Sequence, residues 1–103
     1  MDEINEDGKL NIELTEEIAD GIYSNLVIIS HSNTEFVMDF VKVMPGMPKA
    51  KVKSRILMTP QHVKRLKKAL EDNIQKFESQ FGEIKELANT SFPITFRGSA
   101  GEA

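Results

Sequence analysis

The sequence predicts an α+β fold: an antiparallel meander of about four strands followed by one long amphipathic helix packed on one face of the sheet. Two observations lead to this prediction. Between residues 9 and 58, short apolar or alternating segments are separated by turn residues, which is typical of strands joined as hairpins. From residue 60 onward, apolar residues recur every three or four positions, which is typical of a helix. At 103 residues the chain has the size of one domain.

We expect that single domain to span residues 9–88. Residues 1–8, MDEINEDG, are acidic and polar, and we expect them to be disordered. Residues 89–103 are expected to form a tail that is partly extended and then disordered, because its last residues are small and polar.

Four segments have the composition of strands. Residues 9–14, KLNIEL, alternate apolar and polar side chains, which indicates one buried face. Residues 25–32, NLVIISHS, are apolar on both faces, which is typical of a covered strand. After the turn residues SNT, residues 35–44 supply a partner strand. The segment PGMP then separates it from residues 49–58, KAKVKSRILM.

The helix has the clearest pattern in the chain. Thr59 is suited to the N-cap and Pro60 to the first helical position. Gly82 is expected to end the helix a turn before the apolar pattern stops. The apolar positions at spacings of three or four are Val63, Leu66, Leu70, Ile74, Phe77, Phe81 and Ile84.

One helix covers only one face of a sheet whose two middle strands are apolar on both faces. The remaining face needs another cover, and a second copy of the chain is the simplest one. We therefore expect a homodimer or larger oligomer, assembled through the second face of the sheet or its edge.

The charge is sorted along the chain. Residues 1–41 carry ten acids and one base, residues 42–68 carry nine bases and no acid, and residues 69–103 carry six acids and three bases. The basic segment is a candidate surface for anions or for a partner. It also fits pairing with the acidic segments of the same chain or of another copy. The candidate binding residues are Lys51, Lys53, Arg55, Lys64, Arg65, Lys67 and Lys68.

The sequence offers little for catalysis. It has no Cys, no Gly-x-Ser-x-Gly motif and no glycine-rich phosphate loop. His31 with Glu35 could do acid–base work, but a histidine at the end of a hairpin commonly bonds turn groups. Asp39 is expected to be buried and paired with Arg55 across the sheet rather than to act as a catalytic acid. No residue at the next helical turn supports His62 as a metal ligand. We therefore predict no catalytic, cofactor or metal site.

Targeting signals are also missing. The acidic start of the chain is unlike a secretory signal, and no apolar run approaches the length that spans a bilayer. We expect a cytoplasmic protein that does not contact a membrane.

Three groups of motifs stand out in the sequence: Tyr-Ser-Asn at 23–25, His-Ser with Glu-Phe and Asp-Phe over 31–40, and Ser-Arg-Ile with Met-Thr-Pro and Lys-Arg-Leu over 54–66. Together they resemble a bacterial family catalogued only as a domain of unknown function. The match covers about residues 21–80 and implies no assigned activity. The element order is also similar to the protomer of SecB-type export chaperones, which assemble through sheets and helices and bind unfolded chains. That likeness is one of topology and includes no shared motif.

These observations favour a non-enzymatic oligomeric protein that contacts a protein partner or an unfolded chain, in the manner of a chaperone or adaptor. The alternative is a nucleic-acid-binding protein that uses the basic surface over residues 49–68. Single-strand recognition by stacking is weakly supported, because the chain has six Phe, one Tyr and no Trp, and most Phe fall on predicted core faces.

Overall fold

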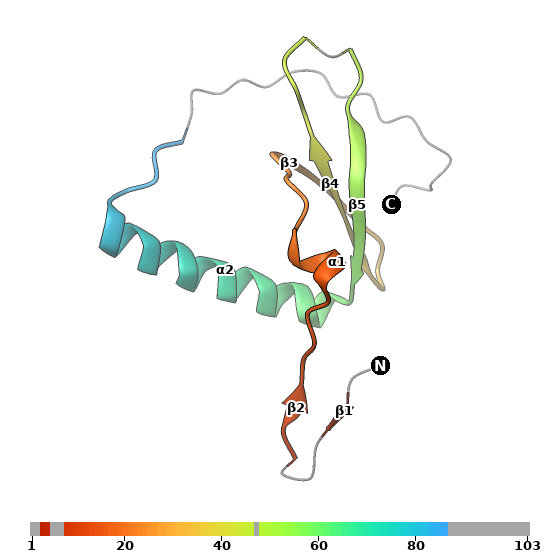
Figure 1. The fold of residues 1–103 in the computed structure, drawn as a ribbon, viewed down its shortest axis with the longest axis vertical. Helices are drawn as coiled ribbons and strands as arrows, with labels where there is room; N and C mark the ends of the chain where they lie inside the picture. Colours follow the sequence, from red (N-terminus) through yellow and green to blue (C-terminus); the bar gives the residue numbers. More distant parts are fainter. Residues whose placement is uncertain (1–2, 5–7, 47, 87–103) are drawn as a thin grey trace.

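The computed structural model describes residues 3–4, 8–46 and 48–86. It contains a three-stranded antiparallel sheet followed by a long helix, so the predicted α+β class is confirmed (Figure 1). The sheet consists of β3 (Leu26–His31), β4 (Phe36–Lys42) and β5 (Lys51–Met58), in the order β3-β4-β5. The helix α2 spans Pro60–Phe81.

The sheet has three strands where about four were expected. Of the segment 9–14, only Leu10–Asn11 forms a strand, β2, and it pairs with β1 (Glu3–Ile4) outside the main sheet. The short helix α1 (Glu16–Ala19), capped by Thr15, lies between this pair and β3 and redirects the chain before it can join the meander. Of residues 1–8, for which disorder was expected, the structure describes residues 3–4, which form β1, and residue 8.

The buried core lies on β4, the middle strand. Met38 and Val41 are the apolar side chains that are buried among the described residues, and Asp39 between them is 1% exposed. Ile28 and Arg55 flank Asp39 in the ladder, and Ile29 and Ile56 flank Met38. The core is therefore narrow and depends on the two neighbouring strands.

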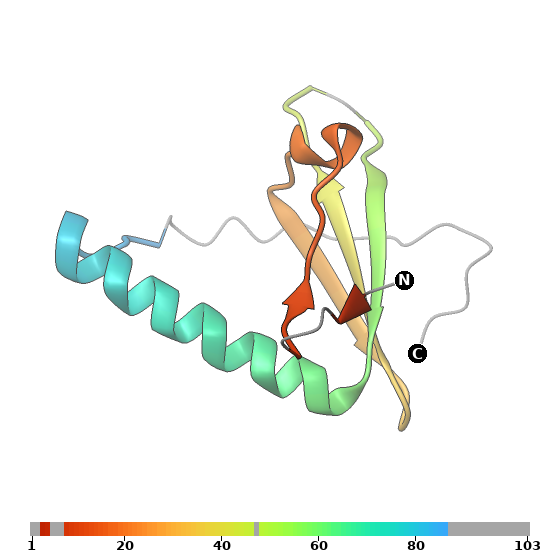
Figure 2. The ribbon, with the colours of Figure 1, turned by 60° about the horizontal axis from the view of Figure 1, so that its bottom comes forward.

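The helix does not lie across the sheet, which corrects the expected packing. In both views α2 leaves the end of β5 and runs away from the sheet (Figures 1 and 2). Thr59 is the single residue between β5 and α2, and its extended conformation (φ -72°, ψ 157°) leads the chain onward rather than back. No residue of α2 is buried.

Both ends of α2 form as the sequence predicts. Thr59 accepts a hydrogen bond from the backbone N–H of His62 at 3.4 Å, and Pro60 occupies the first turn. Gly82 ends the helix with φ 101°, in the left-handed region that favours glycine. The helix thus stops before Ile84, as Gly82 predicts. The expected tail over residues 89–103 lies outside the described residues.

Candidate functional site

A β-bulge in β5 separates three of the candidate cations, Lys51, Lys53 and Arg55, which regular alternation would place on one face of the strand. Phe40 pairs with Ser54 and Val41 pairs with Val52, so Lys53 is the extra residue on β5. The strand register places Lys51 opposite Lys42 of β4 and Arg55 opposite Asp39. The bulge thus interrupts the alternation that would align Lys51, Lys53 and Arg55.

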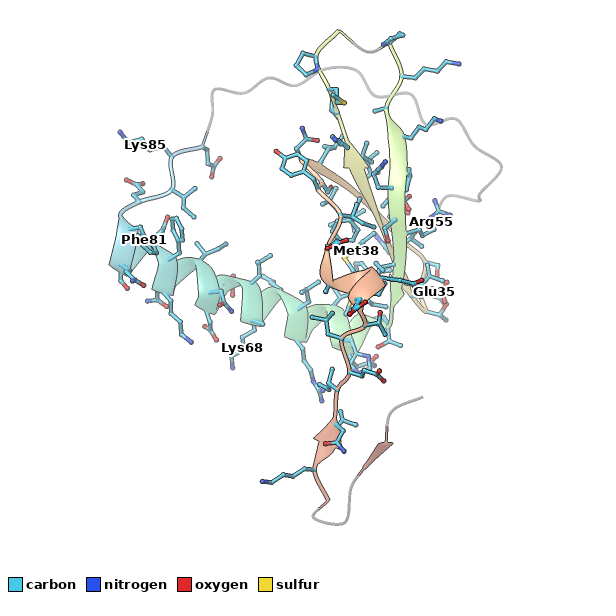
Figure 3. All side chains as sticks on the ribbon, in the orientation of Figure 1. Glu35, Met38, Arg55, Lys68, Phe81 and Lys85 are labelled. Carbon is cyan, nitrogen blue, oxygen red and sulfur yellow. The ribbon has the colours of Figure 1, made fainter. Side chains whose placement is uncertain are left out.

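Arg55 is bound to Asp39, as the sequence predicts. Its Nε and Nη2 donate hydrogen bonds of 2.6 and 2.8 Å to the two carboxylate oxygens of Asp39. The hydrogen bonds from Arg55 hold the pKa of Asp39 below its ordinary value against the opposing effect of burial. The Arg55 side chain is about one-third exposed and projects from β5 (Figure 3). Arg55 therefore neutralises a buried charge within the protomer.

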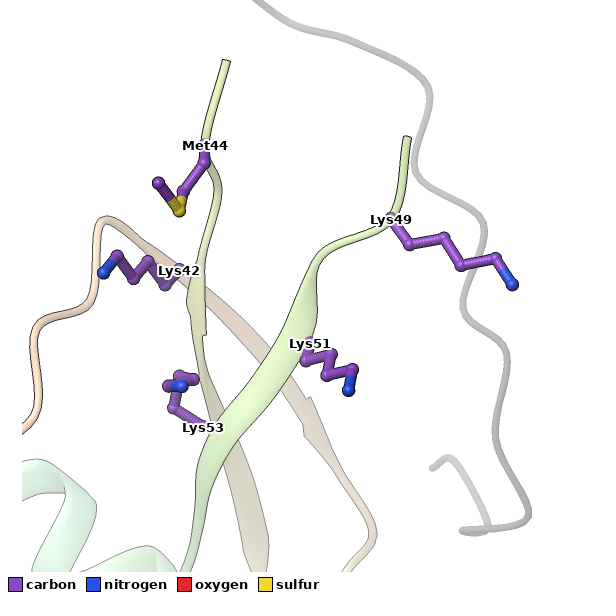
Figure 4. Close-up of a pocket in the computed structure, with 5 residues that line it drawn as sticks. All are labelled: Lys42, Met44, Lys49, Lys51 and Lys53. Carbon is purple, nitrogen blue, oxygen red and sulfur yellow. The ribbon is translucent and has the colours of Figure 1, made fainter. Parts of the chain in front are cut away.

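Lysines of β4, of β5 and of the loop between them surround a shallow hollow of about 300 Å³ at the loop end of the β4–β5 hairpin (Figure 4). Lys42 and Lys53 point to one side of the hairpin, and Lys49 and Lys51 point to the other. The hollow is lined by Lys42, Met44, Lys49, Lys51 and Lys53. The strand register pairs Lys42 with Lys51, but their side chains point to opposite sides of the hairpin in Figure 4, so the two ammonium groups do not face each other. Lysines on an edge strand also prevent unwanted strand pairing, which explains part of the cluster without a ligand.

The helical cations are separate from this hollow. About 16 Å of strand lies between Lys53 and Met58, where β5 ends before the helix. Along α2, Lys67 projects beside the apolar stripe, Arg65 and Lys68 project from the opposite side, and Lys64 lies between Lys67 and Lys68 around the helix. Figure 3 shows Lys68 and Phe81 pointing to different sides of the helix. The seven candidate cations thus do not form one continuous surface: Lys51 and Lys53 line the hollow, Arg55 binds Asp39, and the other four lie along α2.

The structure does not bring His31, Glu35 and Asp39 together. The register puts His31 opposite Phe36 and Asp39 opposite Ile28, so the His31 and Asp39 side chains project from opposite faces of the sheet. The His31 ring stacks on Phe36 with 5.2 Å between centroids and makes no hydrogen bond to Glu35.

His62 caps the helix together with Thr59. Its Nδ1 shares a 3.0 Å hydrogen bond with the Thr59 hydroxyl. In the part of the chain that the structure describes, no group of three or more acidic or histidine side chains could hold a metal ion. Within the same residues, no helix is long and apolar enough to cross a membrane.

Sequence reasoning missed a clamp at the start of β3. The Asn25 side chain donates to the Val43 carbonyl at 2.9 Å and accepts from the Val43 N–H at 2.8 Å, in the way a backbone neighbour would. Ser24 donates to the carbonyls of Leu26 and Val41. The Tyr23 ring lies 6.0 Å from the Lys42 Nζ, within cation–π distance. Ser24 and Asn25 directly precede β3, and side chains of these types often bond to backbone groups. This is the sequence signal that could have indicated the clamp.

Several polar residues of the motifs singled out in the sequence have structural partners within the fold. Besides Ser24 and Asn25, the Ser32 hydroxyl accepts from the N–H groups of Thr34 and Glu35 in the β3–β4 turn. Asp39 binds Arg55, and Thr59 binds His62. These contacts lie in different parts of the fold and do not converge on one cavity.

A family model described as "Protein of unknown function (DUF3467)" matches residues 1–86. This confirms the resemblance to a family of unknown function noted in the sequence. The match includes the whole three-stranded sheet and α2. No curated protein and no solved structure matches the chain. The likeness to SecB-type protomers stays a prediction.

Proposed function

Because the chain belongs to the DUF3467 family, whose function is unknown, we propose a function from the surfaces of the protomer: a non-enzymatic, oligomeric binding protein that contacts an extended apolar segment of another protein. The observation that carries this proposal is the amount of apolar surface left uncovered. Two apolar side chains are buried among the described residues, whereas large apolar residues on the sheet and α2 are 39–68% exposed. Large apolar side chains left exposed on one element in this number mark an interaction site.

The open shape supports the same conclusion. The radius of gyration is 17.1 Å, whereas a compact chain of this length has about 13 Å. A domain of about 100 residues normally gains its stability from a core larger than two side chains. Assembly with a second copy would supply the missing burial.

The partner surface that we favour is the outer edge of β3. The segment Leu26–Ser30 has no charged residue and no proline, and β3 has one strand neighbour, β4. Its Val27 and Ile29 are 40% and 58% exposed. An edge with these properties is open to an extended chain, which adds to the sheet through backbone hydrogen bonds and fills the spaces beside alternate side chains.

The contacts made by the polar motif residues support a binding role rather than a catalytic one. The polar motif residues bind neighbouring groups of the fold, as Asn25 binds Val43 and Asp39 binds Arg55. Among the contacts of the motif residues, that of Thr59 with His62 joins a hydroxyl to an imidazole, but it caps the exposed start of α2 and no further described group orients the His62 ring.

The proposal is tested with a reduced and alkylated model protein that cannot fold, labelled for fluorescence anisotropy. Ile29→Lys should abolish its binding, because a lysine there blocks the β3 edge. Leu57→Lys is the matched control, because Leu57 lies on the opposite edge strand and is 57% exposed. Equal binding by both variants and the native chain would exclude the β3 edge, and the absence of any binding by the native chain would overturn the partner proposal.

A second candidate is nucleic-acid binding, and the lysine-lined hollow on β4 and β5 favours it. Labelled single- and double-stranded DNA and RNA would be titrated at low salt and at about 150 mM salt, since phosphate contacts lose affinity steeply with salt. The double variant Lys51→Ala, Lys53→Ala should then bind more weakly and with a shallower salt dependence. No binding at low salt would exclude this candidate.

A further inference from the structure

The apolar stripe of α2 is regular and uncovered. Leu66, Leu70, Ile74, Phe77 and Phe81 recur at spacings of four, four, three and four, and each is at least 39% exposed. The helix has 22 residues, which makes it about 33 Å long. A stripe with this spacing is suited to packing along a second helix.

The sheet of the same protomer does not cover this stripe. One residue, Thr59, connects β5 to α2, and the helix leads away from the sheet (Figure 2). The cover must therefore come from elsewhere.

The charges beside the stripe indicate what the cover is. One flank carries Lys64 and Lys67 in the first half of the helix and Glu71 and Glu78 in the second half. At about 100° per residue these four positions fall within about 60° of one another around the helix axis. Lys64, Lys67 and Glu71 form no ion pair with another described residue, and the Glu78 carboxylate accepts a hydrogen bond from the N–H of Ile84.

We propose that α2 packs antiparallel against α2 of a second copy of this chain, stripe against stripe. In an antiparallel pair, the same flank of each helix faces the other, so the basic half meets the acidic half. Lys64 then lies opposite Glu78 of the partner subunit, and the two-fold axis passes near Glu71. A parallel pair would instead place this flank beside the opposite flank of the partner helix at the same height, where residues 60–70 offer no acid to Lys64 and Lys67. This inference rests on the oligomer in the proposed function and specifies its interface.

The chain has no cysteine, so single-cysteine variants report the arrangement directly. In the full-length chain, Glu71→Cys should crosslink to a dimer with a short bismaleimide reagent, because the two Glu71 positions meet near the axis. Asp72→Cys is the matched control: it removes the adjacent acid at the same height on α2 but lies opposite the stripe. Lys64→Cys and Glu78→Cys should crosslink when mixed and should not crosslink alone.

Charge exchange supplies a second, independent readout. Lys64→Glu and Glu78→Lys should each weaken self-association by about tenfold, because two attractive pairs become repulsive in each homodimer. Their mixture should regain native affinity as a heterodimer, since both pairs are then complementary. Recovery in the mixture also shows that neither substitution prevents folding.

The outcomes separate this inference from the proposed function. Crosslinking at Glu71→Cys but not Asp72→Cys, with recovery in the charge-exchanged mixture, supports the antiparallel pair. A dimer that crosslinks equally at both positions, or in which Lys64→Cys crosslinks to itself, overturns the helix pairing and leaves the oligomer intact. A chain that sediments as a monomer at every concentration overturns both.

Discussion

The centre of the sheet and helix α2 differ in the origin of the contacts that cover them. On β4, Met38, Asp39 and Val41 are buried by the neighbouring strands, and Arg55 neutralises the Asp39 charge within the protomer. On α2, the two ends are capped within the protomer, yet no side chain of the helix is buried. In α2, hydrogen-bonded helix ends therefore coexist with an apolar stripe that is not buried. We expect changes in the sheet centre to lower stability at any protein concentration, and changes in the α2 stripe to act through association.

The largest expected effect is on the sheet centre. Arg55→Met leaves the buried Asp39 carboxylate without its partner, which should lower the free energy of unfolding by about 3 kcal/mol, near the lower end of the range for such pairs because Arg55 is partly exposed. Urea denaturation at two protein concentrations measures the loss. Arg55→Lys, which keeps the charge, should lose less. A loss below about 1 kcal/mol would show that the ion pair does not stabilise the sheet.

The same ion pair predicts a pH dependence. The pKa of Asp39 is lowered in the folded protein, so its stabilisation is fully present above its ordinary value of 3.8 and is lost as the pH falls through the lowered pKa. Unfolding followed by circular dichroism from pH 6 to pH 2 should show this loss in the native chain. The Asp39→Asn variant should show a shallower acid dependence, and an identical acid profile would contradict the assignment.

The stripe of α2 should respond through assembly. Ile74→Ala removes apolar surface that we place at the helix pair, which should weaken dimerisation by about 2 kcal/mol, or about thirtyfold in Kd. Sedimentation velocity over a dilution series measures the change. Lys68→Ala, on the opposite side of α2, is the control and should dimerise as the native chain does. If both variants dimerise equally well, the stripe is not the interface.

The smallest expected effect concerns the helix cap. Thr59→Ala removes the oxygen that binds the His62 N–H and ring and should lower the free energy of unfolding by about 1 kcal/mol. Thr15→Ala makes the same change at α1, where Thr15 accepts from Ile18 at 3.4 Å. That helix has four exposed residues, so its loss should be smaller. Equal losses at both caps would indicate that α2 contributes no more to the fold than α1.

Features set by neighbouring residues were predictable from the sequence. Three of the four strand segments, the Thr59-Pro60 helix start and the stop at Gly82 depend on local patterns and appear in the structure as expected, whereas the segment 9–14 forms only the short strand Leu10–Asn11. The Asp39–Arg55 pair was also predictable, because an isolated acid on an apolar strand face needs a partner and Arg55 lay on the adjacent strand.

Features set by pairing between distant segments were not predictable. The bulge at Lys53 depends on how β5 aligns with β4, and it changes which lysines share a face. The Asn25 clamp requires the end of β4 to lie beside the start of β3. The direction of α2 depends on one connecting residue, so an amphipathic pattern alone suggested packing on the sheet of the same chain.

The most direct test of the account is the mass of the full-length chain in solution, measured by sedimentation equilibrium from low to high micromolar concentration. We predict a mass of twice the 11.6 kDa chain, with dissociation on dilution or on substitution of Ile74. A mass of 11.6 kDa at every concentration would contradict the account, because the apolar surfaces of α2 would then have no second copy to cover them.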